Sequence, residues 1–350
     1  MEQFLSFRPS IYQLMKNFSH LFEQDDVVPN LLTEIVVTIA TFQEEGTKHV
    51  PIIFIAKDLN LLLSAVRGSD PLQVGEGAAT AAIIHKLFKA CGPLGQGRQW
   101  AIYLLIDKVK GKIKYGLFRT EHLPLQVTSF ERLRFIKEPD LSIIGITRLG
   151  DTIVEVCSSE GNSNYIDISG KIDVTQNPLL IINQFVSAVT RDVPIDVKSK
   201  IEIFYHRIAT EIFSNSHGTL AVVTESASDI PYYLSDGILL KKPFDLSEAV
   251  KKYLNLHDED STLSLVALGQ LIQKMMEMDG VTVFSSSGSV LGYNCFVKDP
   301  ALLSTLVPAI SGGARRRAFE ILSTKIGAEL IGTLFKSQDG MGDCHTNLTI

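Results

Sequence analysis

The chain has 350 residues, of which 45% are hydrophobic and 21% charged, and its formal net charge is −6. Its length indicates about two domains, and its composition excludes wholesale disorder and a collagen-like chain. An acidic chain does not attract polyanions in general, so we expect no nucleic-acid partner, and a nucleotide contact requires a local basic cluster. Four cysteines without a CxxC pair are typical of a reducing compartment and argue against a disulfide scaffold.

Nothing in the sequence indicates a membrane segment. The N-terminus is acidic and lacks the basic and apolar regions of a signal peptide. The longest uncharged run, Val174 to Thr190, contains polar residues and is shorter than the ~20 apolar residues of a membrane-spanning helix. We therefore expect a cytoplasmic protein without membrane contact.

Hydrophobic periodicity predicts alternating helices and strands along the whole chain. In the first half these are a helix over 11–22, a helix or strand over 31–42, a strand over 49–56, a helix over 75–90, a hairpin over 100–106 and 113–118, strands over 141–148, 152–157 and 165–169, and a helix over 178–189. In the second half they are a helix over 198–213, a strand over 218–223, a helix over 263–276, strands over 279–284 and 290–297, a helix over 315–325 and a strand over 328–335. This alternation predicts α/β layered domains. A turn at 191–194 divides the prediction into domains 1–193 and 194–350.

The two halves contain a weak internal echo. A buried strand begins near His49 and again near His217, and each is followed by a helix and a hairpin. One interpretation is a diverged duplication. The other is that two unrelated α/β domains share a common order of elements.

A basic cluster stands at the predicted start of the helix over 315–325. Gly312 and Gly313 allow backbone N–H groups to approach an anion closely, and the helix directs its positive end at the same place. Arg315, Arg316 and Arg317 add guanidinium groups that suit phosphate oxygens. Cations stabilise the C-terminal end of a helix rather than this one, so the pattern favours phosphate or nucleotide binding over a plain solvated surface.

Asp279 and Gly280 open the predicted strand over 279–284, 36 residues before Arg315. An aspartate in this position can hold a divalent cation or orient a hydroxyl, although a simple turn aspartate is the alternative. In an α/β domain the two segments can meet. A metal-binding carboxylate opposite phosphate-binding arginines is the arrangement that phosphoryl transfer requires.

The segments Asp279-Gly280-Val281 and Gly313-Ala314-Arg315-Arg316-Arg317, in this order and spacing, resemble the DGA and GTRHR motifs of the diadenylate cyclase (DAC) family. The resemblance covers roughly 197–340. It implies a layered domain with a mixed central sheet flanked by helices. It also implies a reaction in which two ATP-bound domains face each other, and each 3′-hydroxyl attacks the α-phosphate of the other nucleotide. Cyclic di-AMP and pyrophosphate result.

The resemblance also implies roles for individual residues. Asp279 would bind Mg²⁺ or Mn²⁺ and help to activate the hydroxyl, while Gly280 and Val281 would line the nucleotide. The phosphate-binding segment would be Gly313 to Arg317, with Arg315 and Arg317 holding phosphates and Arg316 standing where the family has histidine. The implied ligand is ATP or another nucleotide, and an active enzyme would be a face-to-face homodimer.

Four departures from the family pattern leave the activity open. Val281 replaces alanine, Ala314 replaces threonine, Arg316 replaces histidine, and Ser337-Gln338-Asp339 replaces Ser-Glu-Glu. The retained Asp279 and arginines favour a cyclase that makes cyclic di-AMP or a related cyclic dinucleotide. The alternatives are a catalytically inactive nucleotide sensor in a signalling or defence system, and an interaction protein that retains only the motif. The N-terminal domain is expected to be regulatory or a diverged copy of the second.

Overall fold

The computed structural model contains two compact units, each built around one sheet. The residues that the structure describes are 2–22, 27–44, 47–95, 99–107, 111–120, 125–149, 153–168, 178–225, 230–234, 236–244, 246–298, 313–337 and 342–348. The first unit comprises Met1–His122 and Val127–Ile172, and the second comprises Leu123–Gln126 and Asp173–Ile350. The helix over 178–189, which the sequence placed before the domain boundary, thus belongs to the second unit. No described helix combines the length and the apolar character needed to cross a bilayer.

The first unit is a seven-stranded mixed sheet with helices on both faces. Its helical elements are α1 (Glu2–Ser19), η1 (His20–Phe22), α2 (Val27–Thr41), α3 (Leu59–Val66), α4 (Ala81–Cys91), α5 (Ser129–Phe135) and η2 (Pro139–Leu141). Its strands are β3 (Ile53–Ala56), β4 (Gly68–Ala78), β5 (Trp100–Asp107), β6 (Lys112–Thr120), β7 (Ile144–Leu149), β8 (Ile153–Ser158) and β9 (Ser163–Asp167), and β1 (Gln43–Glu44) pairs separately with β2 (Thr47–Lys48). The strand order is β4-β6-β5-β3-β7-β8-β9, and only β3 and β5 are parallel to each other.

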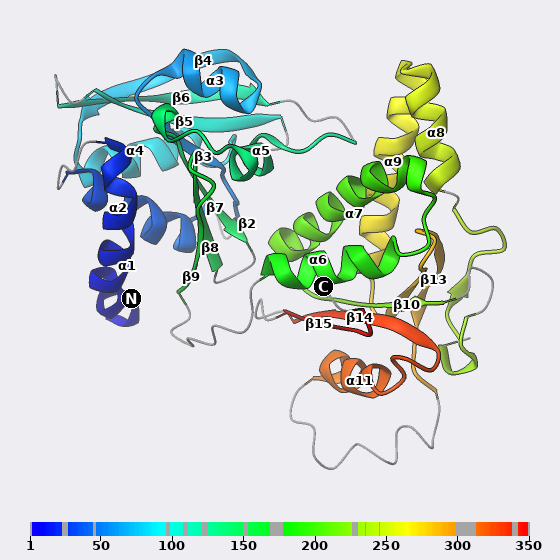
Figure 1. Cartoon of the computed structure of the whole chain (residues 1–350). Coiled ribbons are helices and arrows are strands. Elements are labelled where there is room, and N and C mark those ends of the chain that lie inside the picture. The colour runs from blue at the N-terminus through cyan, green and yellow to red at the C-terminus, as the bar shows by residue number, and fades with distance from the viewer. Residues whose placement is uncertain are drawn as a thin grey trace. The chain divides into compact units, whose positions relative to one another are not determined.

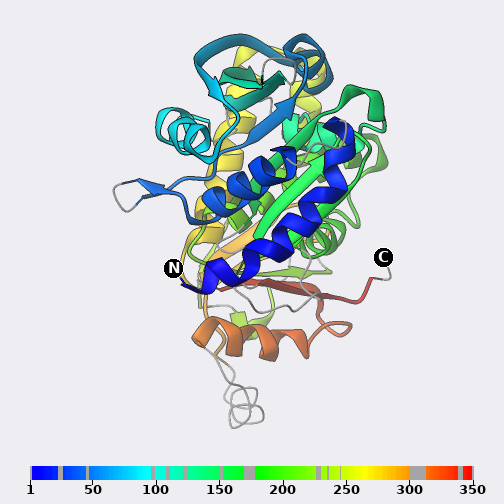
Figure 2. The same ribbon diagram turned by 90° about the vertical axis from the view of Figure 1, so that its left-hand side faces the viewer.

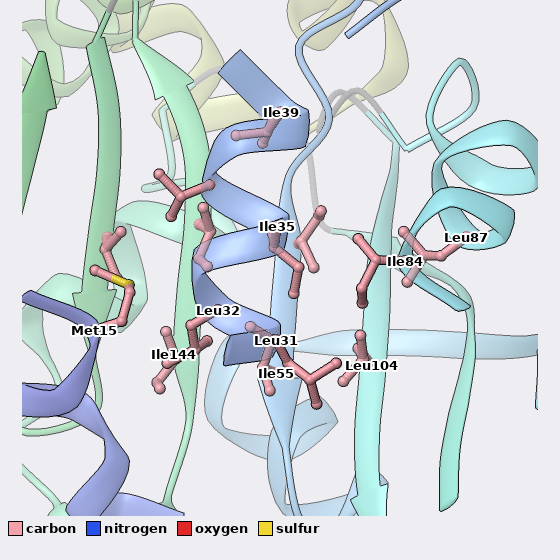
Figure 3. Close-up of a cluster of buried hydrophobic side chains, with 14 of the residues drawn as sticks. Met15, Leu31, Leu32, Ile35, Ile39, Ile55, Ile84, Leu87, Leu104 and Ile144 are labelled. Atoms are coloured by element: carbon pink, nitrogen blue, oxygen red, sulfur yellow. The ribbon is translucent and has the colours of Figure 1, made fainter. Parts of the chain in front are cut away.

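Strand β3 shows why both faces of this sheet need helices. Its side chains alternate between the faces, and all four are buried. Ile53 and Ile55 join a core with residues of α1, α2 and α4, while Phe54 and Ala56 join a second core that contains residues of α3 and α5. Figure 3 shows the first core, in which α2 lies over the sheet and its Leu31 is beside Ile55.

The second unit has a six-stranded mixed sheet. Its helical elements are α6 (Pro178–Val189), α7 (Ile195–Asn215), η3 (Tyr232–Leu234), α8 (Leu246–Leu256), α9 (Glu259–Glu277) and α11 (Ala314–Ser323). Its strands are β10 (Thr219–Thr224), β11 (Ile238–Leu239), β12 (Val281–Ser285), β13 (Val290–Cys295), β14 (Leu330–Lys336) and β15 (Gly342–Thr346). The strand order is β11-β13-β12-β10-β14-β15, and again only one pair, β10 and β12, is parallel.

Helices cover both faces of the second sheet as well. Figure 1 shows α6 and α7 on one side of this sheet and α11 on the other, and Figure 2 shows the same layers with α11 in orange beside β14 in red. On the α11 side, Phe319 and Leu322 pack on Val281 and Val283. On the other side, the ring of Phe284 contacts the rings of Phe185 in α6 and Tyr205 in α7.

The predicted α/β class is confirmed in both units, but the prediction for residues 75–78 was wrong. The sequence predicted a helix over 75–90, but Gly75–Ala78 complete strand β4 and the helix begins at Ala81. The glycines are needed because a Cβ at Gly75 would lie 2.5 Å from the Tyr115 hydroxyl. Periodicity does not reveal this strand, because it lies at the sheet edge and most of its residues are exposed. The undecided segment over 31–42 is helical as part of α2.

Candidate functional site

The turn that carries Asp279 and Gly280 joins α9 to β12 in a fixed position. Two threonine hydroxyls from the sheet donate to carbonyls at the end of α9, from Thr219 to Met276 at 2.7 Å and from Thr282 to Met275 at 3.1 Å. Gly280 has a φ of 86°, and a Cβ there would lie 2.7 Å from the carbonyl oxygen of Cys295. Only glycine fits this turn without strain.

Helix α11 begins beside this turn with its amide groups uncapped. The carbonyl of Gly313 accepts the first helical hydrogen bond, from the amide of Arg317, at 3.1 Å. The amides of the first turn have no acceptor within the helix, and no side chain caps them in the described part of the chain. A Cβ added at Gly313 would meet no described atom within 4 Å. Gly313 and Ala314 are exposed, so the positive end of the helix lies at the surface, where an anion is favoured.

The structure brings Asp279 and Arg315 together. Arg315 Nη2 donates to Asp279 Oδ1 at 2.6 Å. The aspartate side chain is 86% exposed, whereas that of Arg315 is 24% exposed. Arg315 Nε is buried and has no hydrogen-bond partner among the described residues. The predicted meeting of the carboxylate and the arginine cluster is thus present, as an ion pair between the starts of β12 and α11.

The three arginines have different positions. Arg316 pairs with Glu320, one turn further along its own helix, at 2.5 Å, and with Asp343 of β15 at 3.3 Å. Its guanidinium also lies over the rings of Phe319 and Phe335. Arg316 therefore ties α11 to β15, while Arg315 faces the Asp279 turn and Arg317 is exposed.

Of the remaining predicted residues, Val281 is buried and Ala314 is exposed. Val281 is buried in the core with its backbone paired to Cys295, so the larger side chain is accommodated inside the domain. Ala314 is exposed in the first turn of α11. Residues 311–312, which precede this helix, and 338–340, which include most of the Ser-Gln-Asp segment, lie outside the described residues.

Sequence reasoning missed an aromatic side chain beside the turn. Phe296 directly follows Cys295, the strand partner of Val281, and its side chain is 48% exposed. Its amide donates to Asp236 Oδ1 at 3.2 Å, and Asp236 is also paired with Lys298 at 2.5 Å. The available signal was a large apolar residue at the end of a predicted strand. Burial raises the pKa of the neighbouring Cys295 thiol to about 11, so this cysteine stays protonated at neutral pH.

Asp279 can serve as one protein ligand of a divalent cation. No group of three or more histidine, cysteine, aspartate or glutamate side chains in the described part of the chain is placed to hold a metal. Mg²⁺ commonly uses one or two carboxylates together with substrate phosphates. The residues therefore fit a cation that arrives with a nucleotide, and they do not form a metal cage of their own.

Comparisons of the chain with family models, with curated proteins and with solved structures find no match, so the DAC assignment rests on the motifs alone.

Proposed function

We propose that the second unit is a DAC-like domain that binds a nucleotide by its phosphates at the start of α11. The observation that carries this proposal is the Asp279–Arg315 pair beside the uncapped end of that helix. A phosphate here would accept hydrogen bonds from backbone amides and from a guanidinium, which are the groups that bind phosphate most often in proteins.

The pair also indicates how the ligand would enter. Within the described part of the chain, the carboxylate partner of Arg315 is Asp279, whose side chain is exposed, and a phosphate carries more negative charge than that carboxylate. Arg315 would therefore exchange Asp279 for the phosphate, and Asp279 would become available to a cation that accompanies the nucleotide. Such a cation would neutralise part of the phosphate charge.

Phe296 supports a nucleotide over a simple phosphate. A half-exposed ring beside the Gly280 turn offers a face on which a base can stack. The proposal thus assigns the phosphates to α11 and the base to the end of β13.

Of the two activities that remain, binding without turnover is favoured by Arg316 and Ala314. Arg316 is engaged by Glu320 and Asp343, and Ala314 has no hydroxyl to offer. We therefore propose a nucleotide sensor. The second candidate is the cyclase, in which each ATP 3′-hydroxyl attacks the other α-phosphate and pyrophosphate leaves. The exposed carboxylate of Asp279 favours it, since sensing alone does not require that group.

The test is calorimetric titration of the full-length protein with ATP, with and without Mg²⁺, followed by chromatography of the mixture for cyclic dinucleotide. Arg315→Ala is expected to weaken binding by about tenfold or more, since a hydrogen bond to a charged group contributes ~1.5–3 kcal/mol. Arg119→Ala is the matched control, because Arg119 forms an exposed pair with Asp70 at 2.7 Å in the first unit.

Each outcome of this test separates the candidates. Saturable binding without product supports the sensor, whereas product made by the wild type and lost in Asp279→Asn establishes the cyclase. Absence of ATP binding by the wild-type protein would overturn both and leave an interaction protein. An equal effect of Arg315→Ala and Arg119→Ala would show that the site lies elsewhere.

A further inference from the structure

The two sheets have the same strand order and the same strand directions over six strands. Strands β3, β4, β5, β6, β7 and β8 of the first unit correspond in order to β10, β11, β12, β13, β14 and β15 of the second. In each sheet the first and third of these strands form the only parallel pair. The fourth then pairs with the third as a hairpin, the second pairs outside the fourth, and the fifth and sixth extend the other side of the first strand. Strand β9 is an addition at the far edge of the first sheet.

The helix order repeats in part, whereas α3 of the first unit and α8 of the second have no α-helical counterpart among the described residues. Two helices precede the first strand in each unit, and one helix leads directly into the third strand, α4 in the first unit and α9 in the second. Among the described residues, α5 is the α-helix that follows the hairpin in the first unit, and α11 is the α-helix that follows it in the second. In the first unit α4 packs on the core of α1 and α2, while α5 packs on the opposite core. In the second unit α11 likewise lies on the face opposite α6 and α7 (Figure 1).

A similar side-chain interaction is present in both units, although the arginine follows its phenylalanine in α5 and precedes it in α11. In the first unit, Arg134 of α5 donates twice to Glu155 of β8, with both distances 2.6 Å, and its guanidinium lies over Phe130. In the second unit, Arg316 of α11 pairs with Asp343 of β15 and lies over Phe319. In both units, therefore, an arginine stacked on a phenylalanine ties the last helix to the last corresponding strand.

The start of α5 differs from the start of α11 in the groups that bind phosphate. The amide of Glu131 donates to Thr128 Oγ1 at 3.2 Å, and the carboxylate of Glu131 accepts from the amide of Thr128 at 2.8 Å. This capping box satisfies the amides and places a negative charge in the first turn of α5. Helix α11 has no such cap and no acidic residue in its first turn. Strand β5 begins at Trp100 and is preceded by Gln99, so its described start has neither an aspartate nor a glycine.

We infer that the two units are copies of one domain, and that the first copy has lost the phosphate site. This inference rests on the proposed function for the identity of the ligand. Each chain then binds one nucleotide, through its second unit. Two nucleotides can be joined only if a second chain supplies the other site, so any cyclase activity must depend on association of chains.

The test is a titration of the ¹⁵N-labelled full-length protein with inorganic pyrophosphate, followed by the backbone amide resonances. We expect saturable shifts for Ala314 to Arg317 and none for Ser129 to Glu131. In Arg315→Ala the same shifts should require about tenfold more pyrophosphate. Calorimetry with ATP should give one site per chain.

The failures of the two proposals are distinguishable. Saturable shifts at Ser129 to Glu131, or two ATP sites per chain, would overturn the loss of the first site while leaving nucleotide binding by the second unit in place. No shift at either helix would overturn the proposed function and, with it, the single site. A crystal structure in which the two sheets had different strand orders would refute the duplication whatever the ligand.

Discussion

Arg315 and Asp279 form an ion pair at 2.6 Å, although they are 36 residues apart in the sequence. The pair joins the turn between α9 and β12 to the start of α11. The aspartate therefore competes with any phosphate for the same guanidinium. In Asp279→Asn we expect ATP binding without metal to tighten by about fivefold, the ~1 kcal/mol upper range of an exposed ion pair. Calorimetry in a chelator measures this. Weaker binding in the chelator would show that Asp279 contacts the ligand directly.

Addition of Mg²⁺ should reverse the order of the two ATP affinities, so that the wild-type protein binds ATP more tightly than Asp279→Asn. If Asp279 is a ligand of the cation that accompanies ATP, Mg²⁺ strengthens binding in the wild-type protein and has little effect in Asp279→Asn. The same response to Mg²⁺ in both proteins would remove Asp279 from the cation site.

Gly280→Ala is expected to destabilise the second unit through both backbone strain and a clash. Its φ of 86° costs a non-glycine residue ~1–3 kcal/mol, and the new Cβ would also lie 2.7 Å from a backbone oxygen. Gly327→Ala is the matched control, because Gly327 has a φ of 87° and no described atom within 4 Å of a Cβ. Urea unfolding should show the larger loss at Gly280. Equal losses would mean that the turn can relax.

Phe296→Ala is expected to weaken ATP binding and to leave the binding of inorganic triphosphate unchanged. Stacking of a base on an aromatic ring contributes ~1–3 kcal/mol, so the loss for ATP should be about tenfold. Parallel titrations with the two ligands measure the difference. Equal weakening of both would show that Phe296 supports the phosphate site rather than the base.

Lys336 is a buried lysine on β14 that completes the end of α7. Its ammonium donates to the carbonyl oxygens of Ser216 at 2.5 Å and Ile212 at 3.2 Å. Lys336→Met should cost ~1–3 kcal/mol in urea unfolding, because the Ser216 carbonyl loses this donor, whereas the Ile212 carbonyl keeps the backbone amide of Ser216. Lys274→Met, which removes an exposed lysine paired with Glu277, should cost less than ~1 kcal/mol. The prediction fails if the two variants are equally stable.

Asp192 should make the stability of the second unit depend on pH in the acidic range. Hydrogen bonds from Arg191, and then from Ser286 at 2.5 Å, lower the pKa of Asp192 below its ordinary value. A lowered pKa in the folded state stabilises the protein above the unfolded value of ~3.9, and this contribution is lost as pH falls through the folded pKa. Asp192→Asn should therefore melt below the wild type at neutral pH, and the gap in melting temperature should close as the pH falls through the lowered pKa of Asp192. A gap that does not change with pH would assign the effect to the hydrogen bonds alone.

Much of the fold follows from local pattern, and the remainder depends on tertiary contacts. The hairpin at 100–118 and helix α9 have strong periodicity and appear near their predicted places. Helix α5 is only seven residues long, so its signal was too short to recognise, and β4 has too few buried side chains to show its period.

The candidate site was predictable in its charges but not in its contacts. Asp279 and the arginines were found from residue type and spacing. The sequence did not reveal that Arg316 would turn toward Asp343, because that contact requires β15, which was not predicted. Phe296 was missed because its place at the end of a predicted strand does not show what lies beside it, and that neighbourhood is set by strand pairing.

The hydroxyls of Thr219 and Thr282 fix the C-terminal end of α9 to the sheet, so the helix and the Asp279 turn are mechanically coupled. Nineteen residues at 1.5 Å each give it a length of about 28 Å. Its last carbonyls are hydrogen-bonded to β10 and β12. A movement of the Asp279 turn would therefore displace the C-terminal end of α9, and the rigid helix would tilt as a whole. A tilt of about 5° would move the far end by about 2.5 Å, as follows from that length. That end adjoins α8, so a displacement of the Asp279 turn would reach the junction of α8 and α9.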